Sequence, residues 1–251
     1  MIRVAAVGDI HVGRDMAGLL FEQLGSVSTR ADVLLLAGDL TKAGRPDEAE
    51  LLVRELAGVE VPIVAVLGNH DHHSDRASEV AGILRDARIE VLEGDHTVIE
   101  TPGGTVGVAG VKGFGGGFAG ASGSAFGERE MKAFIEHSEE RASALGDALA
   151  AVDADVTIAL MHYSPVRETL SGEPPEIFPF LGSYLLAEAV DRGGADLAIH
   201  GHAHRGREQG VTPGGVHVRN VAQTVIRQGY AVYEFDPEAT GGRNRAAASS
   251  A

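Results

Sequence analysis

One apolar run of this sequence is followed closely by asparagine, histidine and aspartate. Residues 62–73 read PIVAVLGNHDHH, in which the apolar stretch Ile63–Leu67 is followed, after one glycine, by Asn69, His70 and Asp71. An unbroken apolar run of this length is typical of a strand buried on both faces. Polar groups at the carboxyl end of a buried strand lie where open α/β sheets bind their ligands. The stretch therefore predicts a site that binds metal or transfers protons.

Four other apolar runs end in residues of the same types. The runs and the residues after them are Ile2–Val7 with Asp9 and His11, Val33–Ala37 with Asp39, Val156–Met161 with His162, and Leu197–Ile199 with His202 and His204. Any one of these histidines alone would be read as an ordinary surface or core residue. Because they all follow predicted strands, we expect one metal site assembled from the whole chain.

The donor types restrict the metal. The chain contains no cysteine, so nitrogen and oxygen donors must hold the ions. Such a set suits Mn, Fe, Zn, Co or Ni better than a structural zinc site, and it holds too many nitrogens for calcium. The two oxygens of Asp39 can bridge two cations. Two ions about 3.5–4 Å apart can hold a bridging hydroxide and clamp a phosphoryl group during in-line displacement.

Strands and helices alternate in the first part of the chain. The predicted strands are Ile2–Val7, Val33–Ala37 and Ile63–Leu67, and the predicted helices are Met16–Leu24, one that begins at Arg45–Glu48, and one near Ser78–Ala87. This alternation indicates parallel strands covered by helices.

Later elements follow a different order. We expect a hairpin of Val98–Glu100 and Val106–Val111, a long helix Glu128–Val152, a strand Val156–Met161, a helix Gly182–Val190, and strands Leu197–Ile199, Val216–Val221 and Tyr230–Phe235, the last two as antiparallel neighbours. Residues 112–127 contain seven glycines, too many for helix or strand, and are expected to be a mobile surface loop beside the site, either a lid or without a ligand role. The irregular segment Tyr163–Pro179 is a candidate for part of the substrate wall.

Size and charge limit the remaining possibilities. The 251 residues carry 21 basic and 36 acidic side chains, a formal net charge of −15, which disfavours nucleic acid and anionic membranes as partners. No secretory signal is visible, and no apolar stretch approaches the ~20 residues that span a bilayer. We expect a cytoplasmic protein with a single domain over residues 1–236 and a disordered tail over 237–251.

Five blocks in order resemble the calcineurin-like metallophosphoesterases. They are Asp9-Ile10-His11, Gly38-Asp39, Gly68-Asn69-His70-Asp71, His162 and Gly201-His202-Ala203-His204. The resemblance implies an α/β fold of two mixed β-sheets packed face to face, with helices outside. It also implies two metal sites, one held by Asp9, His11, Asp39 and His204, and the other by Asp39, Asn69, His162 and His202. By the same resemblance His70 protonates the leaving oxygen or steadies phosphoryl charge, and Asp71 orients its imidazole.

Two differences from the motifs of known branches narrow the choice among the branches of this family. Lys42 and Ala43 stand where protein phosphatases of the family have Asp and Arg, and the tyrosine ligand of purple acid phosphatases is missing. The run from Gly38 to Thr41 looks more like the bacterial phosphodiesterases, which include cyclic-nucleotide phosphodiesterases. The resemblance thus implies hydrolysis of a small-molecule phosphodiester. A phosphomonoesterase and a non-catalytic scaffold of the same fold remain alternatives, and the substrate, the metals and the oligomeric state stay open.

Several other polar residues have weaker assignments. His72, His73 and His200 adjoin the site in sequence, but strand alternation can point them away from it. His96, His137 and His217 are expected on the surface. Arg14 and Lys112 could pair with a substrate phosphate, although a solvated surface position is the simpler expectation for both.

Overall fold

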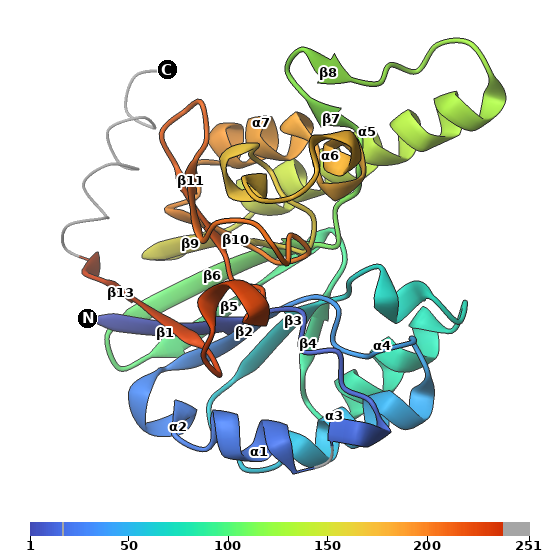
Figure 1. Ribbon diagram of the computed structural model, residues 1–251. Coiled ribbons are helices and arrows are strands. Elements are labelled where there is room, and N and C mark those ends of the chain that lie inside the picture. Colours follow the sequence, from blue (N-terminus) through green and yellow to red (C-terminus); the bar gives the residue numbers. More distant parts are fainter. Residues whose placement is uncertain (17, 238–251) are drawn as a thin grey trace.

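Two β-sheets pack face to face, and helices cover the outer face of each sheet (Figure 1). The structure is a computed structural model that describes residues 1–16 and 18–237. The first sheet has five strands and the second has six. This arrangement of two mixed sheets with flanking helices confirms the predicted fold class.

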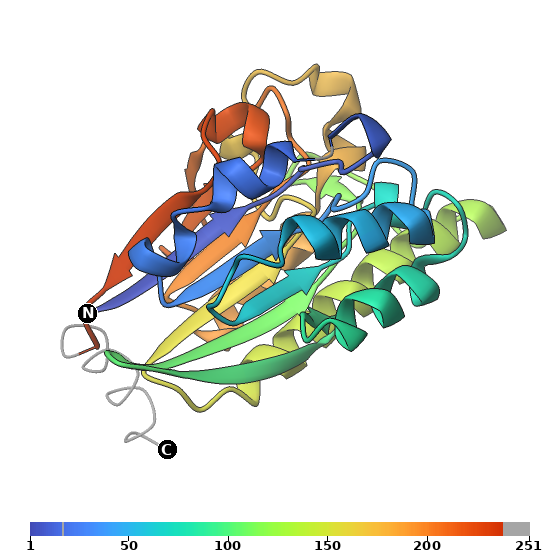
Figure 2. The ribbon, with the colours of Figure 1, turned by 90° about the horizontal axis from the view of Figure 1, so that it is seen from below.

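The first sheet is formed mainly by the first third of the chain. Its strands, in spatial order, are β13 (Ala231–Phe235), β1 (Ile2–Val7), β2 (Val33–Ala37), β3 (Ile63–Val66) and β4 (Glu90–Leu92). Strands β1 to β4 are parallel, and β13 pairs antiparallel with β1. The outer face carries α1 (Leu19–Leu24), α2 (Val27–Arg30), α3 (Pro46–Glu55) and α4 (Ala77–Asp86), as Figure 2 shows from below.

The second sheet is formed by the later part of the chain. Its strands, in spatial order, are β11 (Gln209–Val211), β12 (His217–Asn220), β10 (Leu197–His200), β9 (Val156–Met161), β6 (Gly104–Val111) and β5 (Asp95–Thr101). The long helix α5 (Arg129–Ala150) and helix α7 (Tyr184–Gly193) cover its outer face (Figure 1). The remaining elements are η1 (Arg14–Met16), η2 (His70–His72), η3 (Glu168–Leu170), η4 (Pro175–Ile177), α6 (Phe178–Leu181), α8 (Gln223–Ile226), β7 (Gly117–Phe118) and β8 (Ala121–Ser122).

Alternate residues of the central strands enter different cores. In β2, Val33, Leu35 and Ala37 pack between the two sheets, whereas Leu34 and Leu36 pack against the helices of the first sheet. Successive side chains of a strand point to opposite faces, and here both faces are covered. This is why the central strands read as unbroken apolar runs and why the polar residues begin only where the strands end.

Three expectations from the sequence are corrected. The expected helix Met16–Leu24 is divided, because Met16 ends the 3-10 helix η1 and the α-helix α1 begins only at Leu19. Strands β12 and β13, expected to be antiparallel neighbours, lie in different sheets, because β12 pairs with β10 and β13 pairs with β1. Strands β4 and β11 are short and had no recognisable pattern.

The glycine-rich segment 112–127 is the third correction, because it contains the β7–β8 hairpin. Glycine lets this backbone approach a neighbouring segment closely: Gly116 N–H donates to Pro179 O at 2.7 Å, and Gly117 N–H donates to Gly182 O at 2.9 Å. Gly116 and Gly117 both have positive φ angles, which other residues rarely adopt. The segment from 115 to 118 is buried and forms part of the wall next to α6.

The expected single domain over residues 1–236 stays a prediction. The expected disordered tail, apart from Pro237, lies outside the described residues. No helix in the described ranges is long and apolar enough to cross a membrane.

Candidate metal centre

The carboxyl ends of β1, β2, β3, β9 and β10 meet at one edge of the two sheets and bring the predicted ligands together. Two groups of side chains could each hold an ion. The first group is Asp9, His11, Asp39 and His204, and the second group is Asp39, His162 and His202. Within each group every residue offers one ligand atom, and these atoms lie within 4.8 Å of one another. Asp39 belongs to both groups, so its two oxygens can serve two ions.

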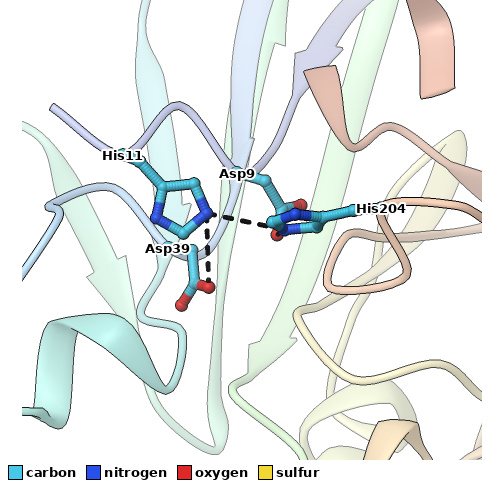
Figure 3. Close-up of side chains that lie close together, drawn as sticks. All are labelled: Asp9, His11, Asp39 and His204. Carbon is cyan, nitrogen blue, oxygen red and sulfur yellow. Dashed lines mark hydrogen bonds and ion pairs between the residues drawn. The ribbon is translucent and has the colours of Figure 1, made fainter. Parts of the chain in front are cut away.

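The first group is drawn in Figure 3. His204 Nε2 lies 2.8 Å from Asp9 Oδ1, and His11 Nε2 lies 3.7 Å from Asp39 Oδ2. The two imidazole nitrogens, Nε2 of His11 and Nε2 of His204, are 3.5 Å apart. Residues that follow β1, β2 and β10 thus converge across almost two hundred positions of sequence.

Asn69 joins the second group. His162 Nε2 lies 3.3 Å from Asp39 Oδ1 and 2.9 Å from Asn69 Oδ1. The rings of His162 and His202 are 4.7 Å apart between centroids. All seven residues expected to bind metal therefore lie together, although their ligation of metal remains a proposal.

Unusual backbone conformations place several of these side chains. In the described part of the chain, seven non-glycine residues have positive φ, and four of them are Asp9, His11, Asp39 and His202. Residues held in this sparsely populated region concentrate at functional sites, where the surrounding structure compensates their strain. The strand pattern alone would not have aimed these four side chains.

Three glycines of the sequence blocks leave room for the ligands. A Cβ at Gly38 would lie 2.6 Å from His162 Nδ1, and a Cβ at Gly68 or at Gly201 would overlap the carboxyl group of Asp39 or of Asp9, respectively. Any side chain there would displace a predicted ligand. The glycines in these blocks are therefore required by close packing around the site.

The second group is oriented through the other ring nitrogens of its histidines. His162 Nδ1 donates to Ala37 O at 2.9 Å, which leaves Nε2 facing Asp39. His202 Nε2 donates to Phe180 O at 3.3 Å, which leaves Nδ1 available to a metal. Hydrogen bonds of this kind fix the tautomer and the ring orientation of metal-binding histidines.

The electrostatics of the site suit a cation. Asp39 is 1% exposed and Asp9 is 4% exposed. Burial raises the pKa of Asp9 to about 6, although the bond to His204 opposes the shift, and burial lowers the pKa of His11 to about 4 and that of His202 to about 3. Neutral imidazoles are the form that binds metal. Two adjacent buried carboxylates with histidine partners are costly unless a cation compensates them, so the residues present fit metal ions.

His70 lies beside the first group. Its ring is 4.5 Å from the ring of His11, and its Nε2 lies 4.0 Å from Asp39 Oδ2. Its Nδ1 donates to Lys42 O at 2.8 Å, which directs Nε2 toward the site. The expectation that Asp71 orients this imidazole is therefore corrected: the acceptor is the carbonyl of Lys42.

Asp71 instead joins two loops. Its buried carboxylate accepts hydrogen bonds from the backbone N–H groups of Leu40, Thr41 and Gly68 and from the Thr41 hydroxyl, at 2.6–3.1 Å. These bonds hold the segment after β2 against the segment after β3. The two loops carry Asp39, Asn69 and His70, so Asp71 acts on the site through the backbone.

The residues with weaker assignments fall into different environments. His200 is fully buried and structural, because Nδ1 donates to Gly201 O at 2.7 Å and Nε2 accepts from the Thr169 hydroxyl at 2.9 Å. Arg14 is exposed and pairs with Asp47. His72, His73, His96 and His217 are exposed, and His137 is half-buried.

The sequence predicted the wrong environment for Lys112. It was expected on the surface, yet it is only 7% exposed. A signal for this was present, because Lys112 follows the predicted strand Val106–Val111 as His162 follows Val156–Met161. The sequence does not reveal the register between neighbouring strands, and this register is what makes the two positions neighbours.

Comparisons of structure show the same fold in proteins with little sequence similarity. A phosphopantetheinyl hydrolase from Mycobacterium tuberculosis is 17% identical, with a TM-score of 0.67, over 94% of this chain and 96% of that one. The protein TT1561 of Thermus thermophilus is 19% identical, with a TM-score of 0.57, over 88% and 89% of the two chains. A putative 5'-nucleotidase from Staphylococcus aureus is 18% identical, with a TM-score of 0.55, over 87% of this chain and 48% of that one.

Comparisons of sequence identify the family. No curated protein matches the chain. The family model described as calcineurin-like phosphoesterase matches residues 2–206, which contain both candidate metal-binding groups. This match over most of the 251 residues confirms the resemblance inferred from the five blocks, and the chain belongs to the calcineurin-like phosphoesterases.

Proposed function

We propose that this protein is a phosphoester hydrolase that uses two divalent transition-metal ions. The observation that carries the proposal is the position of Asp39, whose two oxygens belong to two separate groups of potential ligands. Mn, Fe, Zn, Co and Ni all suit these nitrogen and oxygen donors, and cellular supply decides among them as much as ligand type does.

The proposed roles follow from the contacts in the site. Asp9, His11, Asp39 and His204 would hold one ion, and Asp39, Asn69, His162 and His202 would hold the other. When bound, such ions supply Lewis acidity, which neutralises phosphoryl charge and activates water for attack. Burial favours the neutral imidazoles of His11, His162 and His202, and the carbonyls of Ala37 and Phe180 orient the rings of His162 and His202.

His70 is proposed to assist departure of the leaving group. With Nδ1 donating to Lys42 O, its Nε2 faces the space beside Asp39. A protonated ring in this orientation can give the Nε2 proton to the leaving oxygen or donate a hydrogen bond to the phosphoryl group. Its side chain is 44% exposed, so a substrate can reach it.

The proposed substrate is a small-molecule phosphodiester, on the likeness of the Gly38–Thr41 run to bacterial phosphodiesterases. A phosphomonoester is the second candidate, and a buried lysine beside the second group favours it, as described below. A scaffold without activity is a weaker alternative, because both ligand groups are complete and His70 is present.

The test removes the shared carboxylate. In Asp39→Ala, the two ions lose their common ligand, so we expect both to bind more than about 100-fold more weakly and turnover to be abolished. Manganese binding by calorimetry and hydrolysis of nitrophenyl esters with added Mn²⁺ measure the two effects. Asp86→Ala on the exposed end of α4 is the matched control. Two tightly held ions and full turnover in Asp39→Ala would refute the proposal.

A further inference from the structure

Lys112 is the direct neighbour of His162 on the adjacent strand. Strands β6 and β9 are parallel, and their register pairs Val111 with Met161, so the next residues along the two chains are Lys112 and His162. The backbone agrees with this placement, since His162 N–H donates to Lys112 O at 3.0 Å. A cationic side chain therefore begins one strand away from a proposed metal ligand.

The alternation of β6 directs this side chain toward the site. Val106 and Val108 pack between the two sheets, whereas Ala109 and Val111 pack toward α5 and α7. Lys112 continues the series of Val106 and Val108, as His162 continues the inter-sheet series of β9. Both side chains thus project into the space where the carboxyl ends of the two sheets meet.

The ammonium group is buried without a carboxylate partner. Its Nζ lies 4.9 Å from the ring centroid of Phe114 and 5.2 Å from that of Tyr163, and it donates one hydrogen bond to Gly113 O at 3.1 Å. Among the described residues it forms no ion pair with a carboxylate. An ammonium has three donors, and the described part of the chain gives one of them a hydrogen-bond acceptor, beside the two aromatic rings. Glu93 and Asp39 act on this charge only from beyond ion-pair distance, so its burial is incompletely compensated.

The rings around Nζ connect it to the second group. The ring of Tyr163 lies 4.4 Å from that of His202 and 5.6 Å from that of His162, between centroids. On the other side, Phe114 contacts His137 at 4.7 Å between centroids. Burial, and after it the positive charge of Lys112, lowers the pKa of His72 and of His137, as expected of a charge near both.

We propose that Lys112 binds an anionic oxygen of the substrate, one that a simple phosphodiester does not have. This inference rests on the proposed function. This oxygen is either the second ionised oxygen of a phosphomonoester or an oxygen of a further phosphate on the organic part of a diester. Either one would accept a charge-assisted hydrogen bond from Nζ.

The experiment replaces the charge and keeps the shape, with Lys112→Met in the full chain loaded with Mn²⁺. One substrate pair is p-nitrophenyl phosphate and bis(p-nitrophenyl) phosphate, which differ by the second phosphoryl charge. The other pair is the p-nitrophenyl ester of thymidine 5'-phosphate with and without a 3'-phosphate. Lys132→Met, on the exposed face of α5, removes the same charge elsewhere and is the matched control.

We expect Lys112→Met to lower kcat/KM about 10- to 100-fold on the more charged member of one pair, mainly through KM, and to leave its partner within about threefold. The pair that responds identifies the source of the oxygen. Equal effects on both members of both pairs, or no effect on any, would overturn the inference. A structural role alone would lower the melting temperature without changing these ratios.

Binding of inorganic phosphate supplies a readout that does not depend on turnover. In calorimetry with the Mn²⁺-loaded protein, we expect Lys112→Met to bind phosphate about tenfold or more weakly than Lys132→Met does. Unchanged phosphate affinity would also count against Lys112 as an anion-binding residue. If the wild type hydrolyses no phosphoester, the proposed function fails, and the phosphate measurement still decides the role of Lys112.

Discussion

The two candidate metal-binding groups share Asp39 and differ most clearly in the burial of one histidine. In the first group, the side chains of His11 and His204 are 23% and 40% exposed, whereas that of His162 in the second group is fully buried. Each group also contains two half-buried residues, His11 and His204 in the first and Asn69 and His202 in the second. The contrast in burial between the groups therefore lies in His162.

The groups also differ in what holds the ligands in place. Both histidines of the second group donate their other ring nitrogen to a backbone carbonyl. In the first group, Asp9 and His11 are aimed by backbone turns with φ angles of 57° and 43°, and His204 Nε2 contacts Asp9 directly. His202 of the second group also has a positive φ, of 69°, so both groups depend on local backbone conformation, and the second group adds hydrogen bonds from its histidine rings.

The largest effect is expected at His70, which lies beside His11 of the first group and beside the shared Asp39. In His70→Ala, the proton donor is lost while all metal ligands remain, so turnover of esters with alkyl leaving groups should fall about 10²–10⁴-fold. Esters of p-nitrophenol leave without a proton and should be affected much less. Equal losses on both kinds of ester would remove His70 from this role, and loss of an ion would show that it supports the first group directly.

Two glycine variants test the two groups separately. The Cβ of Gly38→Ala would press on His162, and the Cβ of Gly201→Ala would press on Asp9. We expect each variant to weaken one ion about 10- to 100-fold, the second-group ion in Gly38→Ala and the first-group ion in Gly201→Ala. Manganese titration of each variant measures this. Simultaneous loss of both ions in both variants would show that the groups are not independent. Gly82→Ala on α4, where a Cβ meets no neighbour, is the control.

The smallest effect is a difference in pH dependence. The bond to Asp9 raises the pKa of His204, whereas burial lowers the pKa of His202 to about 3. In the metal-free protein, His204 should therefore gain a proton at a higher pH than an ordinary histidine does, while His202 stays neutral until the pH is far lower. Protonation competes with metal, so acidification should weaken the first-group ion by up to about tenfold per pH unit before the second.

Proton NMR titration of the metal-free protein, with His204→Gln to assign the signal, measures the order of protonation. Manganese titrations at about pH 7 and about pH 5.5, on either side of the ordinary histidine pKa, then compare the two ions. If His202 gained its proton first, or if both affinities fell in parallel, the electrostatic contrast between the groups would be wrong.

Much of the fold was predictable from the sequence. Strands β1, β2 and β9 have the predicted bounds, because runs such as Val33–Ala37 are apolar on both faces and end at glycine or histidine. The short strands β4 and β11 were not predicted. Strand β12 was predicted, but its pairing with β10 was not, and the β7–β8 hairpin depends on backbone bonds to the segment around Pro179.

The candidate site, like the fold, was predictable only in part. The types and order of Asp9, Asp39, Asn69, His70, His162, His202 and His204 were enough to identify the family and to expect metal ligands. They did not reveal that Lys42 O, rather than Asp71, orients His70, because the two loops meet only in the folded chain. Nor did they reveal that Lys112 is buried, since its position depends on the register of β6 against β9.

The sequence by itself determined which chemical groups are available and at which strand ends they occur, because hydrophobic periodicity and residue type are local properties. Only the tertiary structure decided which groups meet. Pairing between strands, left-handed turns at Asp9 and Asp39, and close approaches at glycine depend on neighbours far along the chain. The place of Asp39 in both ligand groups is a consequence of how the two sheets pack.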